Sequence, residues 1–534
     1  MKKLFVLLLV SLFIVGVFSV GVLAQEDEKV IRVGMWSSPG NMSAINADSS
    51  YGYFVVTFVY DTMAEMRPDF SFKGRLADDW TVSEDGKTFT FNLNPDATWH
   101  DGEALTAEDV LFTIKTVATP GVETNRGSAI RAIEGLDSNG KLAEGEEEIS
   151  GVEVQGTHQI AITTKTALDP ARFLEQFATN LYILPQHLLE GVAPEDLSKS
   201  EVLLNPTVGS GPFKFVKYET DQYIELAKNE DYYGEKAKVD KIFIRIVDAT
   251  SIAAQLVRGE IDVTAGPGIG EIPLQDWDLI RDADNVRTVT EPALGYQFMP
   301  INNAQPYFED VRVRRALLKG INRNLMVDQL YKGEAKLANG PISPVVPYHN
   351  SDLEPVAYDP EGARELLEEA GWDFNRTITL LVPTGNKQRE LSGNIIQANL
   401  NEIGLDVEIQ QQDFPSVLSK VFSKEFDLTL LGWTDTFDPD HLSSTFQTGG
   451  QYNLTNFSDE VIDNLIEEAG AARNPEVRKK LYDELQVKLQ EKVPAVFLYY
   501  PNMLAAVNKR LVNAEPSIFP FEDRAYEWDI KEGE

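Results

Sequence analysis

The chain has 534 residues, 43% of them hydrophobic, and its 84 acidic against 48 basic residues give a formal net charge of -36. Such an excess of negative charge repels phosphate backbones and anionic lipid surfaces, which argues against nucleic acid and membrane surfaces as partners. The absence of cysteine excludes a disulfide framework and a lipid-anchored amino-terminal cysteine, and the length allows about three domains.

The first residues have the pattern of a secretory signal. Lys2 and Lys3 precede an apolar run over residues 4–20, and small residues follow up to Ala24. We therefore predict a signal peptide over residues 1–24, cleaved after Ala24, and a mature protein that is free in a periplasm without a lipid anchor. The alternative is an uncleaved anchor, because about 20 apolar residues can span a bilayer.

The segments that follow alternate between strand and helix patterns. Residues 30–36 alternate apolar side chains as a strand does, and residues 53–66 indicate an apolar helix packed in a core. Asp85–Gly86 separates two alternating runs and predicts a hairpin turn. Thr106 with Asp109 three residues later predicts a capped helix.

An acidic, glycine-bearing stretch over residues 134–148 predicts a solvated loop that interrupts a domain. Strand patterns resume at 152–162 and 213–226. Residues 241–264 then have the order strand, helix, strand, with Gly259 as the helix stop. Sheets flanked by helices are therefore expected.

The second half of the chain is more regular. We expect helices and strands to alternate there, with helices over 310–320, 322–331, 360–370, 387–403, 459–470 and 475–492, and strands over 377–382, 405–410, 426–431 and 495–507. The last helix is expected to turn Val477, Leu481, Leu485 and Leu489 toward the core. The fold class is α/β.

The residue types that carry metal or cofactor chemistry are scattered. The five histidines have no i, i+4 pair and no cysteine nearby, so we expect no metal and no cofactor. The glycines at 266–270 lack dinucleotide-loop spacing and indicate a loop or hinge-side connection. The basic cluster at 312–315 indicates a solvated or salt-bridged helix face.

One enzyme reading stays open as a distant alternative. A secreted glycoside hydrolase needs two carboxylates about 5 to 10 Å apart, and Asp435 and Asp438 are the best local pair. With 84 acidic residues, such pairs arise by chance. We therefore expect that the protein is not an enzyme. A structural protein of the cell envelope is a third class of function to be considered.

The runs from Leu76 to Phe91 and from Trp99 to Val110 carry a recognisable pattern. Together with Gly209–Phe213, Asp310–Leu317, Tyr358–Leu367 and Asp427–Asp440, they resemble the dipeptide- and oligopeptide-binding proteins of ABC importers, the extracellular solute-binding proteins of family 5. The resemblance covers nearly all of the mature chain in order.

The resemblance implies a two-lobed periplasmic binding protein fold, type II-like, with an extra domain inserted in the first lobe. Its expected parts are lobe one at 26–70, 205–290 and 497–534, the inserted domain at 71–204, and lobe two at 291–496. The hinge crossings are then expected near Glu291–Pro292 and Ala495–Val496. A monomer of this kind captures a small solute between its lobes and delivers it to ABC transporter permease subunits.

Candidate ligand-binding residues include Trp36 and Trp433, which end strands, where open α/β sheets place ligands; core packing is the alternative for each. Tyr296 is a further candidate ligand-binding residue. The resemblance implies an aspartate three residues past Trp433 that pairs with a peptide's amino terminus. Here the spacing is one residue short, so either Asp435 takes that role or the role is absent.

The ligand class therefore stays open between two chemistries. If the aspartate role is absent, Trp433 with Tyr452 and Asn453 could stack on and hydrogen-bond a sugar, because flat ring faces suit sugar rings. We expect a peptide, with an oligosaccharide as the alternative.

Overall fold

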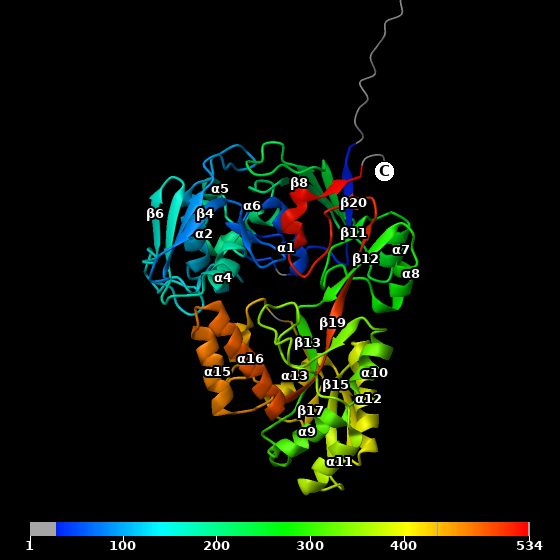
Figure 1. Ribbon diagram of the computed structural model, residues 1–534. Helices are drawn as coiled ribbons and strands as arrows, with labels where there is room; N and C mark the ends of the chain where they lie inside the picture. Colours follow the sequence, from blue (N-terminus) through cyan, green and yellow to red (C-terminus); the bar gives the residue numbers. More distant parts are fainter. Residues whose placement is uncertain (1–27, 48, 435, 532–534) are drawn as a thin grey trace, which may run out of the picture.

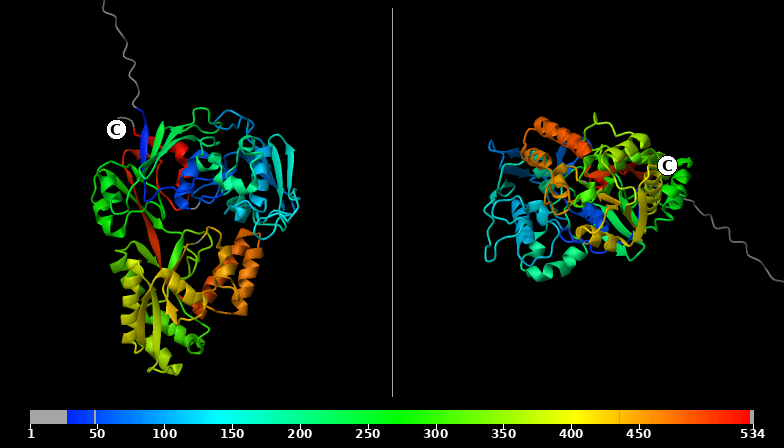
Figure 2. Two further views of the ribbon diagram at one scale, coloured as in Figure 1. Left: turned by 180° about the vertical axis from the view of Figure 1, so that it is seen from behind. Right: turned by 90° about the horizontal axis from the view of Figure 1, so that it is seen from below.

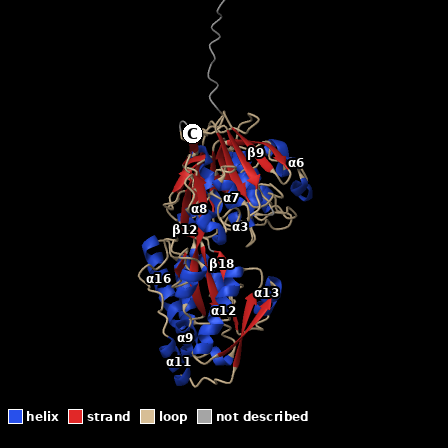
Figure 3. Ribbon diagram, turned by 90° about the vertical axis from the view of Figure 1, so that its right-hand side faces the viewer, coloured by secondary structure: helices blue, strands red, loops and turns tan. Residues whose placement is uncertain are grey.

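The computed structural model describes residues 28–47, 49–434 and 436–531, and it has an upper and a lower part joined at a waist (Figures 1 and 3). The predicted signal peptide with its cleavage site, and Asp435, lie outside the described residues. Within the described ranges, no helix is both long and apolar enough to cross a bilayer.

Lobe one is built on a mixed sheet with a parallel centre. Its elements are β1 (Val30–Met35), β8 (Phe213–Glu219), β9 (Tyr223–Lys228), β10 (Lys241–Ile246), α7 (Ile252–Val257) and β11 (Val263–Thr264). β1 lies between β10 and β11 and is parallel to both, with α7 as the connection, so the predicted strand–helix–strand unit is confirmed. The antiparallel strands β9 and β8 extend the sheet beyond β10.

Helix α1 (Ser50–Val59) is shorter than the predicted helix over 53–66, and a short strand, β2 (Ala64–Met66), takes up the rest of the apolar run. Tyr60 has extended backbone angles, and the next residue, Asp61, is fully buried in an ion pair with Arg75. This tertiary contact outweighs the local apolar pattern, which by itself favours a longer helix.

The segment after β3 (Phe72–Gly74) forms its own antiparallel sheet, in the order β4 (Ala77–Val82), β5 (Thr88–Leu93), β7 (Gln159–Thr163) and β6 (Val152–Gly156). The predicted hairpin is confirmed, because Val82 lies opposite Phe89, and of the two turn residues Gly86 takes the positive φ of 72°. The predicted capping box is also confirmed: Thr106 and Asp109 make both of its hydrogen bonds at the start of α2 (Ala107–Ala118).

Four short helices complete the inserted segment: α3 (Gly127–Ile130), α4 (Pro170–Phe173), α5 (Gln186–Leu189) and α6 (Glu201–Leu204). Residues 134–148 contain no helix or strand, as predicted.

Lobe two has a three-stranded parallel sheet in the order β16 (Asp406–Gln412), β15 (Thr377–Pro383) and β17 (Leu428–Thr429). Its longer helices are α9 (Val311–Gly320), α11 (Pro360–Glu369), α12 (Lys387–Glu402), α13 (Phe414–Phe422), α15 (Glu460–Ala471) and α16 (Pro475–Lys492). Only α13 among these was not predicted. The helix expected over 322–331 is α10 (Arg323–Leu325) continued by a π-helical turn, Met326–Leu330.

The long strand β19 (Ala495–Asn508) joins the two lobes. As far as Pro501 it pairs with β13 (Gly295–Pro300) and β14 (Ala335–Leu337), and from Asn502 it pairs with β12 (Val286–Pro292). The chain therefore crosses between the lobes at residues 293–294 and near 501–502. The second crossing lies beyond the expected Ala495–Val496, because residues 496–500 pack in the cores of lobe two.

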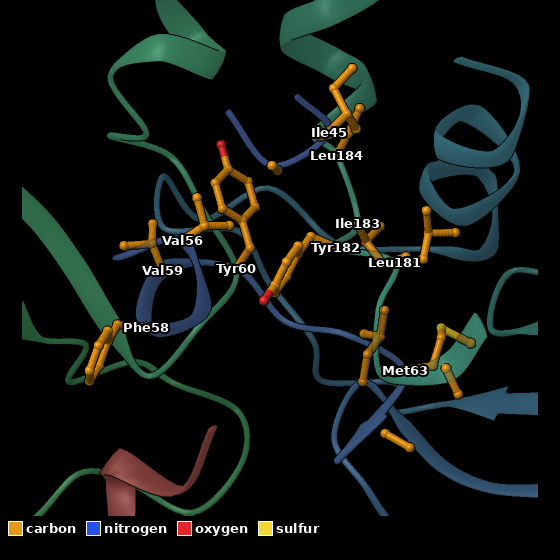
Figure 4. Close-up of a cluster of buried hydrophobic side chains, with 14 of the residues drawn as sticks. Ile45, Val56, Phe58, Val59, Tyr60, Met63, Leu181, Tyr182, Ile183 and Leu184 are labelled. Atoms are coloured by element: carbon orange, nitrogen blue, oxygen red, sulfur yellow. The ribbon is translucent and has the colours of Figure 1, made fainter. Parts of the chain in front are cut away.

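The inserted segment shares one hydrophobic core with lobe one. Figure 4 shows Tyr60 and Met63 of lobe one around Leu181–Leu184 of the inserted segment, and all of these residues are buried. Lobe two has separate cores, and its helices α15 and α16 lie below the inserted segment in Figures 1 and 2. Because close-packed cores resist deformation, we expect lobe one and the inserted segment to move as one body against lobe two.

Candidate functional site

A cleft opens where lobe one, the inserted segment and lobe two meet. Its inner chamber, of about 490 Å³, is lined by Tyr53 of α1, by the loop at 265–269, by the C-terminal segment 517–523, by Arg126 and by Phe437. An outer chamber of about 510 Å³ extends between the inserted segment and lobe two. Arg126, Glu175, Asn180 and Thr436 line both chambers, so the two form one continuous cleft.

Aromatic rings from both lobes meet in the inner chamber. The Phe437 ring of lobe two stacks on Phe519 with the ring centroids 4.6 Å apart, and it meets the edge of Phe70 at 5.5 Å. Phe437 follows β18 (Leu431–Thr434) and precedes Asp438, whose side chain caps a 3-10 helix at 439–441. The cap at Asp438 holds the neighbouring Phe437 at the cleft.

Two tyrosines and an arginine form another part of the wall of the inner chamber. The rings of Tyr53 and Tyr182 are nearly parallel, at 14° and with centroids 6.4 Å apart. The Arg126 guanidinium carbon lies 3.7 Å from the centroid of Tyr53 and 5.3 Å from that of Tyr182. Burial raises the pKa of Tyr182 to about 12, so its hydroxyl stays neutral beside the cation.

Three carboxyl groups of the inner chamber titrate near neutrality. Burial raises the pKa of Glu522 to about 8, of Asp523 to about 7 and of Glu175 to about 7. The negative charge of Asp438 also raises the pKa of Glu175, whereas Arg75 lowers that of Asp523. The inner chamber is therefore less negative below pH 7 than the composition of the chain suggests.

We expect Glu522→Gln to flatten the pH dependence of stability. The folded pKa of Glu522 lies above its ordinary value near 4.5, so the carboxyl costs nothing below that pH and increasingly destabilises the fold as the pH rises through about 8. The melting temperature of the wild type should fall more between pH 5 and pH 9 than that of the variant. Glu84→Gln, on the exposed hairpin turn, should keep the wild-type curve. Parallel curves for wild type and Glu522→Gln would contradict the assignment.

Two carboxylates that line the outer chamber, Asp438 and Asp440, are paired with arginines. Arg478 makes a two-pronged pair with Asp438, at 2.7 and 2.8 Å, and Arg172 of the inserted segment pairs with Asp440 of lobe two. The pair of Asp435 and Asp438 considered for a glycoside hydrolase thus has one member bound to an arginine, and the other lies outside the described residues.

The structure brings Trp433 and Tyr452 together, with ring centroids 5.8 Å apart, and Tyr452 lines the outer chamber. Asn453 follows directly, but its side-chain amide donates to the carbonyls of Gln447 and Phe457 and so holds its own loop.

The other two predicted residues lie away from the cleft. Tyr296 is 1% exposed and packs between Phe298 and Phe497 in a lobe-two core. Trp36 lines a different crevice of about 710 Å³ together with Glu271 and Tyr331, and residues 293 and 501–502 at the lobe crossings line it too.

Sequence reasoning missed Arg126, Glu175, Phe437 and Phe519 as lining residues. They come from four places in the chain that no sequence spacing connects. A signal existed only for Phe437, because it lies inside the recognised run Asp427–Asp440.

The model of the bacterial extracellular solute-binding proteins, family 5 (middle), matches residues 71–453. The chain belongs to this family. This solute-binding protein is 26% identical over 500 residues to the oligopeptide-binding protein AppA from Bacillus subtilis, a match that covers 90% of this chain and 87% of AppA. The crystal structure of the ABC transporter substrate binding protein CtaP from Listeria monocytogenes is similar, with a TM-score of 0.81, 25% identity, and coverage of 95% of this chain and 100% of CtaP.

Two further structures share the fold of the chain. AppA in complex with a nonapeptide superposes with a TM-score of 0.71 at 24% identity, over 95% of this chain and 100% of AppA. The unliganded open form of the murein tripeptide binding protein MppA gives 0.80 at only 18% identity, over 94% of this chain and 98% of MppA. Both likenesses show that this solute-binding protein shares their fold.

The runs that carried the resemblance are largely structural in this solute-binding protein. His100 accepts a hydrogen bond from the Gly209 amide at Nδ1 and contacts the Gly211 carbonyl through Nε2, which ties two of the runs together. Burial lowers the pKa of His100 to about 4, so the ring stays neutral. Arg314 was predicted on a solvated or salt-bridged face, but it is buried and donates to backbone carbonyls at the end of α16.

Proposed function

We propose that this solute-binding protein captures a peptide in the cleft, closes lobe two over it, and delivers it to the permease subunits of an ABC importer. The observation that carries the proposal is the cleft itself, because lobe one, the inserted segment and lobe two all line it. A ligand that touches both moving bodies stabilises the closed form by its differential affinity for that form.

The chemistry of the walls favours a peptide over an oligosaccharide. The inner chamber offers apolar rings for side chains, an arginine for a carboxylate and carboxyl groups for an amine, and a peptide carries all three partners. The name of AppA supports the same choice. The alternative ligand is an oligosaccharide that stacks on the neighbouring rings of Trp433 and Tyr452, and this alternative can be tested.

The proposal also covers export, location, oligomeric state and the fate of the ligand. The signal peptide is cleaved after Ala24, the mature monomer works in the periplasm, and binding makes or breaks no bond in the ligand. The proposed division into lobes is the one expected from the sequence, except that the second crossing is placed near residues 501–502; the change of partner strand along β19, from β14 to β12, supports this position.

We expect short peptides, and not oligosaccharides, to raise the melting temperature of the mature protein. A ligand at one hundred times its Kd adds about 2.7 kcal/mol to the free energy of unfolding. The measurement is a thermal-shift screen of both ligand classes, followed by mass spectrometry of the recovered ligand. A shift with oligosaccharides alone would overturn the peptide assignment, and a hydrolysed ligand would overturn the transport role.

A further inference from the structure

Arg126 lines both chambers of the cleft, whereas Arg131, which is exposed, lines only the outer one. The guanidinium face of Arg126 lies against the Tyr53 ring, 3.7 Å from the centroid, and such a contact holds a cation by the charge distribution of the ring. Stacking uses the face of the guanidinium and leaves its N–H edge free to point elsewhere. Within the described part of the chain, Nε of Arg126 is buried without a hydrogen-bond partner, and Arg126 makes no ion pair.

Among the described residues, the Arg126 side chain has neither a carboxylate nor a carbonyl as a hydrogen-bond partner, unlike the buried Arg314 and Arg323, which donate to carbonyls. Arg172 and Arg478 each pair with an aspartate of the outer chamber. Arg131 also lines that chamber without an ion pair in the described part of the chain, but it is exposed to water. A buried donor without an acceptor costs free energy, because its hydrogen bond to water is lost and not replaced. A ligand group that accepts from Arg126 recovers this cost, so the site favours such a ligand.

The surroundings of Arg126 leave its charge available. Glu175, Glu522 and Asp523 line the same chamber, and burial raises the pKa of all three toward or above neutrality. In their protonated form these groups do not neutralise a cation. Arg126 also lines both chambers, so a ligand group bound to it lies at the middle of the cleft.

We infer that Arg126 anchors a carboxylate of the bound ligand through the N–H edge of its guanidinium, with Tyr53 and Tyr182 fixing the plane of the group. A carboxylate matches this edge because its two oxygens can each accept one N–H. The inference rests on the proposed peptide function. The carboxylate belongs either to the peptide's C-terminus or to an acidic side chain, and the two sources can be separated experimentally.

The test uses the tightest peptide of the thermal-shift screen and isothermal titration calorimetry on the mature protein. The wild type should bind that peptide about 10- to 100-fold more tightly than the analogue that lacks the anchored carboxylate, since a hydrogen bond to a charged group is worth that much. If the analogue with a C-terminal amide is the weak one, the anchor holds the C-terminus. If the analogue with glutamine or asparagine in place of an acidic residue is the weak one, it holds a side chain.

Variants complete the test. Arg126→Met should lose the same factor for the parent peptide and bind parent and analogue equally, whereas Arg126→Lys, which keeps the charge without the fork, should fall between. Arg258→Met removes a positive charge from the exposed surface of lobe one and should bind as the wild type does. The ligand-free melting temperature of each variant shows whether it is folded.

The outcomes separate this inference from the function on which it rests. If the wild type binds a peptide but does not discriminate against either analogue, the anchor is refuted and the function stands, even if Arg126→Met fails to fold. Equal affinity of the wild type and folded Arg126→Met for the parent peptide refutes it as well. If the wild type binds no peptide at all, the function fails and the anchor with it.

Discussion

Arg478→Met is expected to destabilise lobe two by about 3–5 kcal/mol, because it leaves the buried carboxylate of Asp438 without its counter-ion. Arg478 is 1% exposed, and it donates two hydrogen bonds to Asp438 and one to the Ala469 carbonyl. Burial opposes the charge on Arg478, but the hydrogen bonds with Asp438 more than compensate and raise its pKa. Urea unfolding monitored by circular dichroism is the measurement.

The same substitution should weaken ligand binding. Asp438 caps the 3-10 helix that follows Phe437, so an unpaired Asp438 loosens the loop that lines both chambers. Lys480→Met on the same helix removes an equal charge from an exposed position and should change stability by less than about 1 kcal/mol. Adding Asp438→Asn to Arg478→Met should recover part of the loss, since the amide is neutral. If Arg478→Met alone is as stable as the wild type, the buried carboxylate of Asp438 does not need Arg478 as its counter-ion and the prediction is wrong.

Helix α16 shows where sequence reasoning about the fold reached its limit. Its bounds, Pro475–Lys492, are those predicted, because Asn474 caps it and Pro475 starts it. Its buried face was predicted wrongly at one end: Val477 is 49% exposed, whereas Arg478 and Gln486 are buried beside Leu485 and Leu489. Apolar periodicity cannot identify a polar side chain that is buried because a distant residue pairs with it.

The candidate site was harder to predict than the fold for a related reason. Strands and helices depend on neighbours in sequence, so the capping box at Thr106 and the unit from β10 to β11 could be identified. The inner chamber depends on Arg126, Glu175, Phe437 and Phe519, which only the tertiary fold brings together. Trp433 lies in a run that carried the resemblance, whereas Tyr452 lies outside those runs and was proposed beside Trp433 only as a partner for a sugar.

Arg75→Met is expected to cost lobe one about 3–5 kcal/mol and to do so in a pH-dependent manner. Arg75 pairs with Asp61, which is fully buried, and with Asp523, whose pKa burial raises to about 7 even while Arg75 lowers it. Without the cation, the pKa of Asp523 should rise further. A carboxyl whose folded pKa is raised destabilises the fold as the pH rises through that pKa, so the loss should be larger at pH 8 than at pH 5.

The dependence on pH distinguishes an electrostatic role of Arg75 from simple packing. Deleting a packed side chain leaves a cavity whose cost does not change with pH, whereas the unpaired carboxyl of Asp523 is relieved by protonation in acid. Lys73→Met, two residues earlier and exposed, should show neither the loss nor the dependence. If urea unfolding gives Arg75→Met the same loss at pH 5 and pH 8, its role is packing. Because Asp523 also lines the inner chamber, an electrostatic role makes the wall of the ligand cleft and the stability of lobe one depend on the same cation.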